Sequence, residues 1–296
     1  MLPATQTVVS SLVYGLVTGS MYALMAVGFS LIYGIMRVIN FAHGALYMLG
    51  AYVTFLLTSY LNLEPMLAVT ASFLAVFGVG TMVERFLITP LRIRGEDFLL
   101  NSMLVTIGLS IFIENVMLEI FGAYPRGKIY YYIGQLSFFG VSLSVERLIF
   151  LIAGVTLILL FAIFIKYSKQ GKIIRAAAMN PEAAVSSGID LKKVYLLTFS
   201  IGSGLAAVAG GLLLPITFAH PFVGHEPSLI MFVVVVLGGL GSIAGALLSG
   251  FILGLTKSFV TLFFGAVIHD IIAFIVLLVI LLVRPQGLMG WERPRV

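Results

Sequence analysis

The sequence predicts an all-α, polytopic membrane protein with about eight transmembrane helices and a broken or re-entrant segment near 228–240. Three observations predict this fold class: the composition, the length of the apolar runs and the placement of the cations between them. Hydrophobic residues make up 60% of the 296 residues and charged residues only 10%, against about 25% charged residues in a soluble domain. The mean hydropathy is +1.14. So few ionic groups cannot cover a globule in water, and lipid is therefore the expected solvent.

Eight apolar runs are long enough to cross a bilayer, since a membrane helix needs about 20 residues. In chain order they occupy 8–28, 43–61, 66–88, 99–121, 146–166, 193–215, 242–263 and 267–283. A further run, 228–240, lies between Pro227 and a stretch of glycines and is too short to cross alone. Irregular backbone at membrane depth must be buried in protein or line a cavity. We therefore expect 228–240 to be a broken or re-entrant helix.

The cations predict the orientation of the chain, because cytoplasmic loops of membrane proteins carry an excess of lysine and arginine. Thirteen of the 17 lysines and arginines fall at Arg37, in loops 84–97 and 166–193, and in the tail from Arg284. We place these four regions in the cytoplasm and the connections 62–65 and 122–145 outside. The N-terminus then lies outside. A cytoplasmic C-terminus requires 228–240 to add a partial crossing.

The basic loop 167–192 contains the signals of a short helix. Asn180 is a typical N-cap, Pro181 fits the first helical position, and Gly188 suits a left-handed residue after the last turn. These positions predict a helix of about two turns between Asn180 and Gly188. Such a short helix is unstable alone in water. We expect it to dock against a surface, either of its own protein or of a partner.

Two glycine-interrupted apolar segments, 34–46 and 238–247, lie one in each half of the chain. Paired interrupted helices point to a transport path, and the positions concerned are Gly44, Gly238, Gly239 and Gly241. The alternative is that these glycines only let helices pack closely. Both interpretations stay open for the pair, while close packing is favoured for each glycine taken singly.

Three polar side chains stand out because polar groups within membrane spans are expensive and often functional. Glu114 lies well inside the span 99–121 and either faces a cavity as a proton-carrying acid or bonds to a neighbouring helix; we favour the structural role. Asn40 and His43 flank the expected break after Arg37. They either line the inner mouth of a path or cap the second span, and capping is favoured for Asn40.

Several classes of function lack their motifs. No Walker A loop is present, so the chain itself is not expected to hydrolyse ATP. The four histidines are scattered and cysteine is absent, so we expect no metal site, no disulfide and no cofactor. No assembled catalytic set supports a membrane enzyme. The cations are spread over loops between spans, which argues against nucleic acid, and the uncharged start argues against a cleaved signal peptide.

The chain resembles the permeases of ABC importers for branched-chain amino acids, the hydrophobic amino acid uptake family, and is more similar to the shorter of the two permeases in such systems. The resemblance covers nearly the whole chain. It is carried, in the family's order, by Arg37-Val-Ile-Asn-Phe-Ala-His-Gly-Ala-Leu-Tyr-Met-Leu-Gly-Ala-Tyr52, Pro181-Glu-Ala-Ala184 with Gly188-Ile189, Val236-Leu-Gly-Gly-Leu-Gly-Ser-Ile-Ala-Gly-Ala-Leu247 and Arg284-Pro-Gln-Gly-Leu288.

The resemblance implies that the chain is a single transmembrane permease domain, 1–296, that moves leucine, isoleucine and valine and whose loop 167–192 couples it to an ATPase. Glu182, Ala183, Ala184 and Gly188 match the coupling pattern of importer permeases, although the Leu-Pro that usually follows is missing after Gly188. The implied partners are a second related permease, two cytoplasmic ATPase subunits and an extracytoplasmic substrate-binding protein. The implied location is the inner or plasma membrane of a prokaryote.

Two alternatives to this function remain at the level of the sequence. The same architecture also serves urea and short amides. A stand-alone carrier driven by an ion gradient is the other alternative, but such a carrier has no need of a docking helix, and one buried acid is little support for proton coupling. A path lined by glycine, alanine and aliphatic side chains suits a small ligand without strong net charge, such as a zwitterion.

Overall fold

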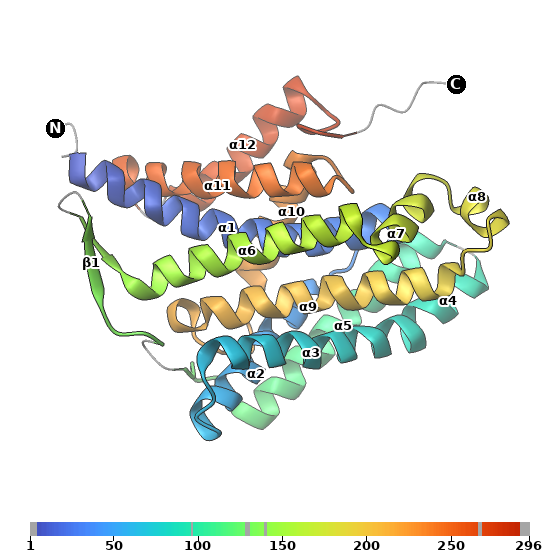
Figure 1. Cartoon of the computed structure of the whole chain (residues 1–296), viewed down its shortest axis with the longest axis horizontal. Coiled ribbons are helices and arrows are strands. Elements are labelled where there is room, and N and C mark those ends of the chain that lie inside the picture. Colours follow the sequence, from blue (N-terminus) through green and yellow to red (C-terminus); the bar gives the residue numbers. More distant parts are fainter. Residues whose placement is uncertain (1–4, 96, 128–130, 139–140, 266–267, 291–296) are drawn as a thin grey trace. The chain divides into compact units, whose positions relative to one another are not determined.

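The computed structural model describes residues 5–95, 97–127, 131–138, 141–265 and 268–290, and these residues are almost entirely helical (Figure 1). The all-α prediction is confirmed. The helices are α1 (Thr5–Met36), α2 (His43–Tyr60), α3 (Pro65–Val83), η1 (Glu84–Ile88), α4 (Thr89–Arg94), α5 (Phe98–Phe121), α6 (Val145–Tyr167), α7 (Lys169–Met179), α8 (Pro181–Ser186), α9 (Leu191–Thr217), α10 (His225–Gly238), α11 (Ile243–Phe264) and α12 (His269–Val283).

The helices follow the predicted spans closely. Six of them, within the described residues, are long and apolar enough to cross a membrane: α1, α3 continued through η1 and α4, α5, α6, α9 and α11. The run 43–61 forms α2, and 267–283 forms the shorter α12. The short run 228–240 is α10, a helix of 14 residues that ends at Gly238 as the glycines predict.

The predicted end of the first span at residue 28 is wrong, because α1 continues for another two turns to Met36. Residues 29–36 are apolar or small, and nothing in them interrupts the helix. The helix ends where Arg37 adopts a left-handed conformation with φ of 56°. For a residue with a side chain this conformation costs roughly 1–2 kcal/mol, so the surrounding structure must hold the break in place.

The described chain divides into two compact units, which we treat separately. Unit 1 comprises Met1–Val27, Tyr130–Thr156 and Leu229–Val296, and unit 2 comprises Gly28–Ile129 and Leu157–Ser228. The divisions therefore fall inside α1, α6 and α10.

Unit 2 is built on α2, α3 and α9, which pack closely against one another. The α2–α9 contact is made by very small residues. A Cβ on Gly50 would lie 2.2 Å from the carbonyl oxygen of Ala207, and one on Gly210 would lie 2.1 Å from that of Tyr47. Lipid gives no hydrophobic drive for helices to associate, so membrane helices depend on such close packing. The helix pair is thus joined backbone to backbone.

Unit 1 uses the same device between the first part of α1 and α11. A Cβ on Gly254 would lie 2.4 Å from the backbone of Gly19, and one on Gly250 would lie 2.6 Å from the backbone of Ala23. Each such contact requires glycine, because a methyl group would push the helices apart. The first part of α1 and α11 therefore approach each other closely at these glycines.

The C-terminal segment of unit 1 folds over the end of α10. The N–H groups of Leu288 and Met289 donate to the carbonyl oxygens of Leu237 and Gly238, at 2.8 and 3.0 Å. These carbonyls belong to the last turn of the helix, which leaves its final acceptors without partners in the helix. Gly287, with φ of 78°, supplies the turn that brings the segment there. The Arg-Pro-x-Gly sequence therefore caps α10.

A two-stranded antiparallel hairpin, β1 (Gln135–Phe138) and β2 (Val141–Ser144), precedes α6 within unit 1. Its register pairs Gln135 with Ser144 and Phe138 with Val141. The sequence predicted only an external connection in this region, because the alternation of apolar and polar residues covers too few positions to identify a strand.

Candidate functional site

The loop 167–192 contains the short helix that its capping residues predict. The helix α8 begins at Pro181, and the Asn180 Oδ1 atom accepts a hydrogen bond from the N–H of Ala183 at 3.0 Å. This bond satisfies one of the donors that the first turn leaves without a partner in the helix. Proline at the first position has no N–H to satisfy. The start of α8 is therefore fixed by Asn180 and Pro181 together.

The end of α8 is a complete Schellman motif centred on Gly188. Its φ of 81° is left-handed, its N–H donates to the carbonyl of Val185 at 2.9 Å, and the N–H of Ile189 donates to that of Ala184 at 3.0 Å. These are the two bonds that define the motif. A helix of six residues thus has a fixed beginning and a fixed end, and both depend on local sequence.

A second helix in the loop, α7, was not predicted. The Ser168 Oγ atom accepts from the N–H of Gly171 at 2.8 Å and caps its start. Gly171 is required there, because a Cβ would lie 2.4 Å from the carbonyl oxygens of Phe164 and Ile165. Buried Ile174 and Ala177 face the rest of unit 2. The serine cap and the spacing of these apolar residues are the signals that could have identified α7.

The surface of α8 is almost fully exposed. Ala184 is buried and anchors the helix, whereas Glu182 and Ala183 are exposed. Two apolar side chains that sequence reasoning missed are also exposed here: Met179 at 78% and Val185 at 53%. They lie three residues before and three residues after the exposed Glu182, so this short stretch of the loop exposes both apolar and acidic side chains. Their signal in the sequence was the presence of bulky apolar residues inside an otherwise polar, basic loop.

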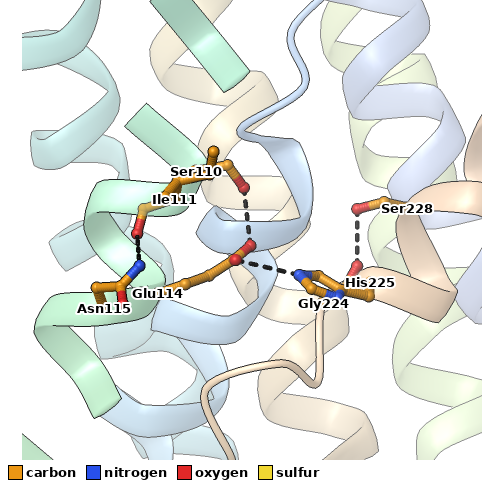
Figure 2. A network of polar contacts seen from close by, with 7 residues as sticks. All are labelled: Ser110, Ile111, Glu114, Asn115, Gly224, His225 and Ser228. Carbon is orange, nitrogen blue, oxygen red and sulfur yellow. Dashed lines mark hydrogen bonds and ion pairs between the residues drawn. The ribbon is translucent and has the colours of Figure 1, made fainter. Parts of the chain in front are cut away.

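Glu114 lies in a network of polar contacts between α5 and the start of α10 (Figure 2). The Ser110 hydroxyl donates to Glu114 Oε1 at 2.9 Å, and His225 Nε2 lies 3.1 Å from Glu114 Oε2. The carboxylate is nearly buried, while the imidazole is 59% exposed. The neighbouring Asn115 bonds only within its own helix, to the carbonyl of Ile111. Glu114 therefore ties two helices together through its partners.

The break between α1 and α2 lies beside the middle part of α5. The Thr106 hydroxyl accepts from the N–H of Phe41 at 3.1 Å and lies 3.3 Å from the carbonyl oxygen of Ile39. Thr106 is eight residues after the start of α5, which is about 12 Å along a helix axis. Non-helical backbone therefore lies at depth along α5, and its polar groups have protein partners, as a membrane environment requires.

Asn40 and His43 are both fully buried at this break. The Asn40 Oδ1 atom accepts from the N–H of Ala42 at 3.1 Å, which closes a turn just before α2. This is a local bond of the kind expected for a capping residue. The His43 ring packs edge-on against Phe29 with centroids 5.8 Å apart. Both side chains therefore contribute to the structure of the break.

Gly44 brings the first turn of α2 against the turn that precedes α10. A Cβ on Gly44 would lie 1.9 Å from the Ser228 hydroxyl and 2.5 Å from the carbonyl oxygen of Gly224, and a Cβ on Gly224 would lie 2.1 Å from the carbonyl oxygen of Gly44. Two helix starts thus meet within unit 2. Gly224 directly precedes His225, the partner of Glu114 (Figure 2).

The glycines at the other end of α10 have a different set of neighbours. A Cβ on Gly238 would lie 2.4 Å from the backbone of Gly245, and one on Gly239 would lie 2.5 Å from the N atom of Gly290. Gly239 and Gly241 also have left-handed φ values of 99° and 86°. All three glycines therefore stand at close backbone contacts or in left-handed turns.

The electrostatics of the turn before α10 are set by its two histidines. Burial lowers the pKa of His220 below its usual value, and the nearby His225 lowers it further. Across the part of the chain that the structure describes, no group of three or more His, Cys, Asp or Glu side chains is arranged to hold a metal ion.

These features define a multi-span membrane protein with a broken helix at depth and an exposed, doubly capped helix in its basic loop. The chain belongs to the family described as branched-chain amino acid transport system / permease component, whose model matches residues 11–281.

Individual relatives span the same length. The chain is 34% identical to the high-affinity branched-chain amino acid transport system permease protein LivH of Escherichia coli (strain K12), over 95% of this chain and 94% of the relative. It is 35% identical to the permease protein BraD of Pseudomonas aeruginosa, over 100% and 99%.

A more distant similarity links the chain to the other kind of permease. The permease protein LivM of Escherichia coli (strain K12) is 25% identical over 93% of this chain and 69% of the relative. No match was found among the solved structures.

Proposed function

We propose that the chain is the membrane-spanning permease subunit of an ATP-driven ABC importer for branched-chain amino acids. It forms the translocation path for leucine, isoleucine and valine and couples that path to ATPase subunits. The observation that carries the coupling role is α8, since an exposed helix fixed at both ends serves a partner rather than the fold of its own chain. Family membership and the names of the full-length relatives support the substrate class.

The coupling loop 167–192 acts through α8. Asn180 and Pro181 set the start of the helix, and Gly188 sets its end. Ala184 holds it to the protein, so Glu182, Ala183, Met179 and Val185 are presented to the ATPase. An exposed apolar pair beside a carboxylate suits a groove that has an apolar floor and a cationic rim. The rest of the chain, 1–296, works as one permease domain.

The path passes the two helix starts that meet at Gly44 and Gly224. Asn40 and His43 hold the irregular backbone there, and Glu114 anchors the start of α10 through His225. Helix N-termini carry partial positive charge and are used by transporters to face anionic groups. Gly238, Gly239 and Gly241 serve the path indirectly, by allowing the tight turn that fixes the other end of α10.

The partners follow from the same role. A second, related permease completes the membrane core, and the similarity to LivM supports a relationship between the two kinds of subunit. Two cytoplasmic ATPases supply the ATP hydrolysis, and an extracytoplasmic binding protein delivers the substrate. The assembly lies in the inner or plasma membrane of a prokaryote, with loop 167–192 on the cytoplasmic side.

Purification of the tagged chain from its native membrane tests this function. We expect ATPase subunits and a second permease to copurify, and we expect ATP-dependent uptake of labelled leucine when the complex and its binding protein are reconstituted in liposomes. Uptake of urea or acetamide in place of leucine would reassign the substrate. Ion-driven uptake by the isolated chain without ATP would refute the ABC role.

A further inference from the structure

Arg92 of α4 contacts two aromatic rings and the end of α1. Its guanidinium carbon lies 3.8 Å from the centre of the Tyr195 ring and 4.7 Å from the centre of the Phe98 ring. Its Nη2 atom donates to the carbonyl oxygen of Met36 at 3.3 Å. We call Arg92, Phe98, Tyr195 and the Met36 carbonyl the arginine cluster, and all of it lies within unit 2.

The arginine cluster joins the ends of four helices. Met36 is the last residue of α1, Arg92 is in the last turn of α4, Phe98 is the first residue of α5, and Tyr195 is in the second turn of α9. The last carbonyls of a helix have no partner within it, and the Arg92 guanidinium supplies one to α1. A position over two rings favours arginine, because the guanidinium is planar and the ammonium of lysine is not.

The π-helical turn η1, which lies between α3 and α4, sets the side of the helix on which Arg92 lies. A π-turn inserts one residue into an α-helix, and such turns often occur at functional sites. One extra residue rotates the following positions by about 100° around the helix axis. A hydrogen bond spans the turn, from the Thr89 hydroxyl to the buried Glu84 carboxylate at 2.7 Å. The local sequence therefore directs Arg92 into the cluster.

One side of the arginine cluster leads to the coupling helix α8. Residues 187–190 alone separate α8 from α9, and hydrogen bonds fix their course. The N–H of Ile189 donates to the carbonyl of Ala184 at 3.0 Å, and the Asp190 side chain caps the start of α9. Both α7 and α8 also contact α9. We therefore expect a displacement of α8 to move the first turns of α9, and Tyr195 with them.

The other side of the arginine cluster leads to the helix break on the proposed path. Met36 directly precedes Arg37, whose left-handed backbone ends α1, and Asn40 and His43 follow in the break. The break is also bonded to Thr106 of α5, a helix that begins in the cluster. One guanidinium thus contacts both the helix that leads into the break and the helix that lies beside it.

We propose that Arg92 is a positioning residue that couples α8 to the helix break; this rests on the import function proposed above. The guanidinium holds the end of α1 and the start of α5 against the first turns of α9. When the ATPases displace α8, the contact between Arg92 and Tyr195 passes the displacement to the break. Coupling between distant sites travels through contacts of this kind, between packed side chains and rigid helices.

The ratio of leucine imported to ATP hydrolysed tests this role, measured in proteoliposomes that contain the whole transporter and its binding protein. Arg92→Lys keeps the charge and loses the planar group, so we expect the ratio to fall by about threefold or more while ATP hydrolysis continues. Arg85→Lys is the matched control, because Arg85 is an exposed arginine in the same continuous helical segment. It should keep the native ratio.

Variants of Tyr195 test the contact from its other side. Tyr195→Leu removes the ring and should lower the ratio as Arg92→Lys does. Tyr195→Phe keeps the ring and should keep most of the native ratio. Since the two residues act as one unit, combining Arg92→Lys with Tyr195→Leu should lower the ratio no further than either change alone.

A native ratio in Arg92→Lys or in Tyr195→Leu overturns the proposal. A parallel loss of uptake and hydrolysis overturns it as well, because a purely structural cluster changes the amount of working complex and not its ratio. If one variant fails to assemble with the ATPases, the other decides, and failure of both shows a structural role alone. A native complex that hydrolyses ATP yet imports no leucine would instead refute the import function.

Discussion

Gly188 has a backbone conformation that most residues avoid, and the end of α8 depends on it. With φ of 81°, a β-branched side chain at this position costs roughly 1–2 kcal/mol. The six residues of α8 have little helical stability of their own to oppose that cost.

We therefore expect Gly188→Val or Gly188→Pro to abolish ATP-dependent uptake while the protein stays in the membrane. Gly188→Asn is the matched control, since asparagine tolerates the left-handed region, and it should keep most activity.

Glu182→Lys should also abolish uptake, because it reverses the charge on the exposed face. Normal uptake by Gly188→Val, Gly188→Pro and Glu182→Lys alike would remove the docking role; the readout is leucine uptake per amount of chain in the membrane.

Glu114 should behave as a structural tie rather than as a proton carrier. We expect Glu114→Gln to keep most of the uptake, because the amide oxygen still accepts from the Ser110 hydroxyl and the amide NH2 group can donate to the ring nitrogen of His225. Glu114→Leu removes the acceptor and should lower the stability of the complex by about 1–3 kcal/mol. Thermal unfolding is measured for each Glu114 variant, for His225→Gln and for each Glu114 variant combined with His225→Gln. The comparison gives the coupling free energy between positions 114 and 225. Complete loss of uptake in a stably folded Glu114→Gln would instead assign a functional acid.

At the scale of single residues, the sequence predicts the role of a residue best when its interaction partner lies nearby along the chain. The roles of Asn180, Pro181 and Gly188 follow from neighbours within a few positions, and the structure confirms the helix they delimit. Glu114 was recognised as a buried acid with an open role, because its partner His225 is remote in the chain. Lys257, which lies inside the predicted span 242–263, was missed although the sequence shows it; only its contact with Tyr22 of α1 depends on a remote part of the chain.

The pairing of α2 with α9 is the clearest feature at the scale of elements. Their contact consists of glycine and alanine backbone, and a single methyl group at Gly50 would meet the Ala207 carbonyl at 2.2 Å. We expect Gly50→Ala to destabilise unit 2 by about 1–3 kcal/mol through overpacking.

Gly108 of α5 provides the matched control for this prediction. A Cβ at Gly108 has nothing within 4 Å, so the same substitution there should be neutral or slightly stabilising. Thermal unfolding of the purified variants in one detergent compares them. Equal effects of Gly50→Ala and Gly108→Ala would show that helix propensity, and not the contact, decides the outcome.

Helices were easier to predict than the contacts between them. Long apolar runs identify α3, α5, α6, α9 and α11 because composition alone decides whether a segment stays in lipid. The end of α1 was placed too early, since no polar residue marks it before Arg37. The meeting of Gly44 with Gly224 could not be predicted, because any of several glycine-containing segments offers the same small residue.

At the scale of the whole molecule, the property to test is the side of the membrane on which each loop lies. The chain is well suited to cysteine labelling, which measures this property. It contains no cysteine, so single cysteines can be introduced without a background. The exposed positions Ser187, Gln286 and Tyr124 lie in the coupling loop, the C-terminal segment and the connection after α5.

In intact cells, a membrane-impermeant maleimide should label Tyr124→Cys and leave Ser187→Cys and Gln286→Cys unlabelled until the cells are permeabilised. The basis is the positive-inside rule applied to the four cationic regions. Labelling of Gln286→Cys in intact cells would place the C-terminus outside and show that α10 adds no partial crossing. Labelling of Ser187→Cys in intact cells would exclude contact between α8 and a cytoplasmic ATPase.

The backbone contact between α2 and α9 has a consequence for work outside the membrane. The contact depends on van der Waals packing between the two backbones and not on the surrounding solvent. Exchanging lipid for detergent therefore leaves the attraction between α2 and α9 unchanged. The faces of α5 and α6 are largely exposed and depend on whatever apolar molecules surround them. We expect short-chain detergents to loosen α5 and α6 first, while α2 and α9 stay joined as the most solvent-independent part of the protein.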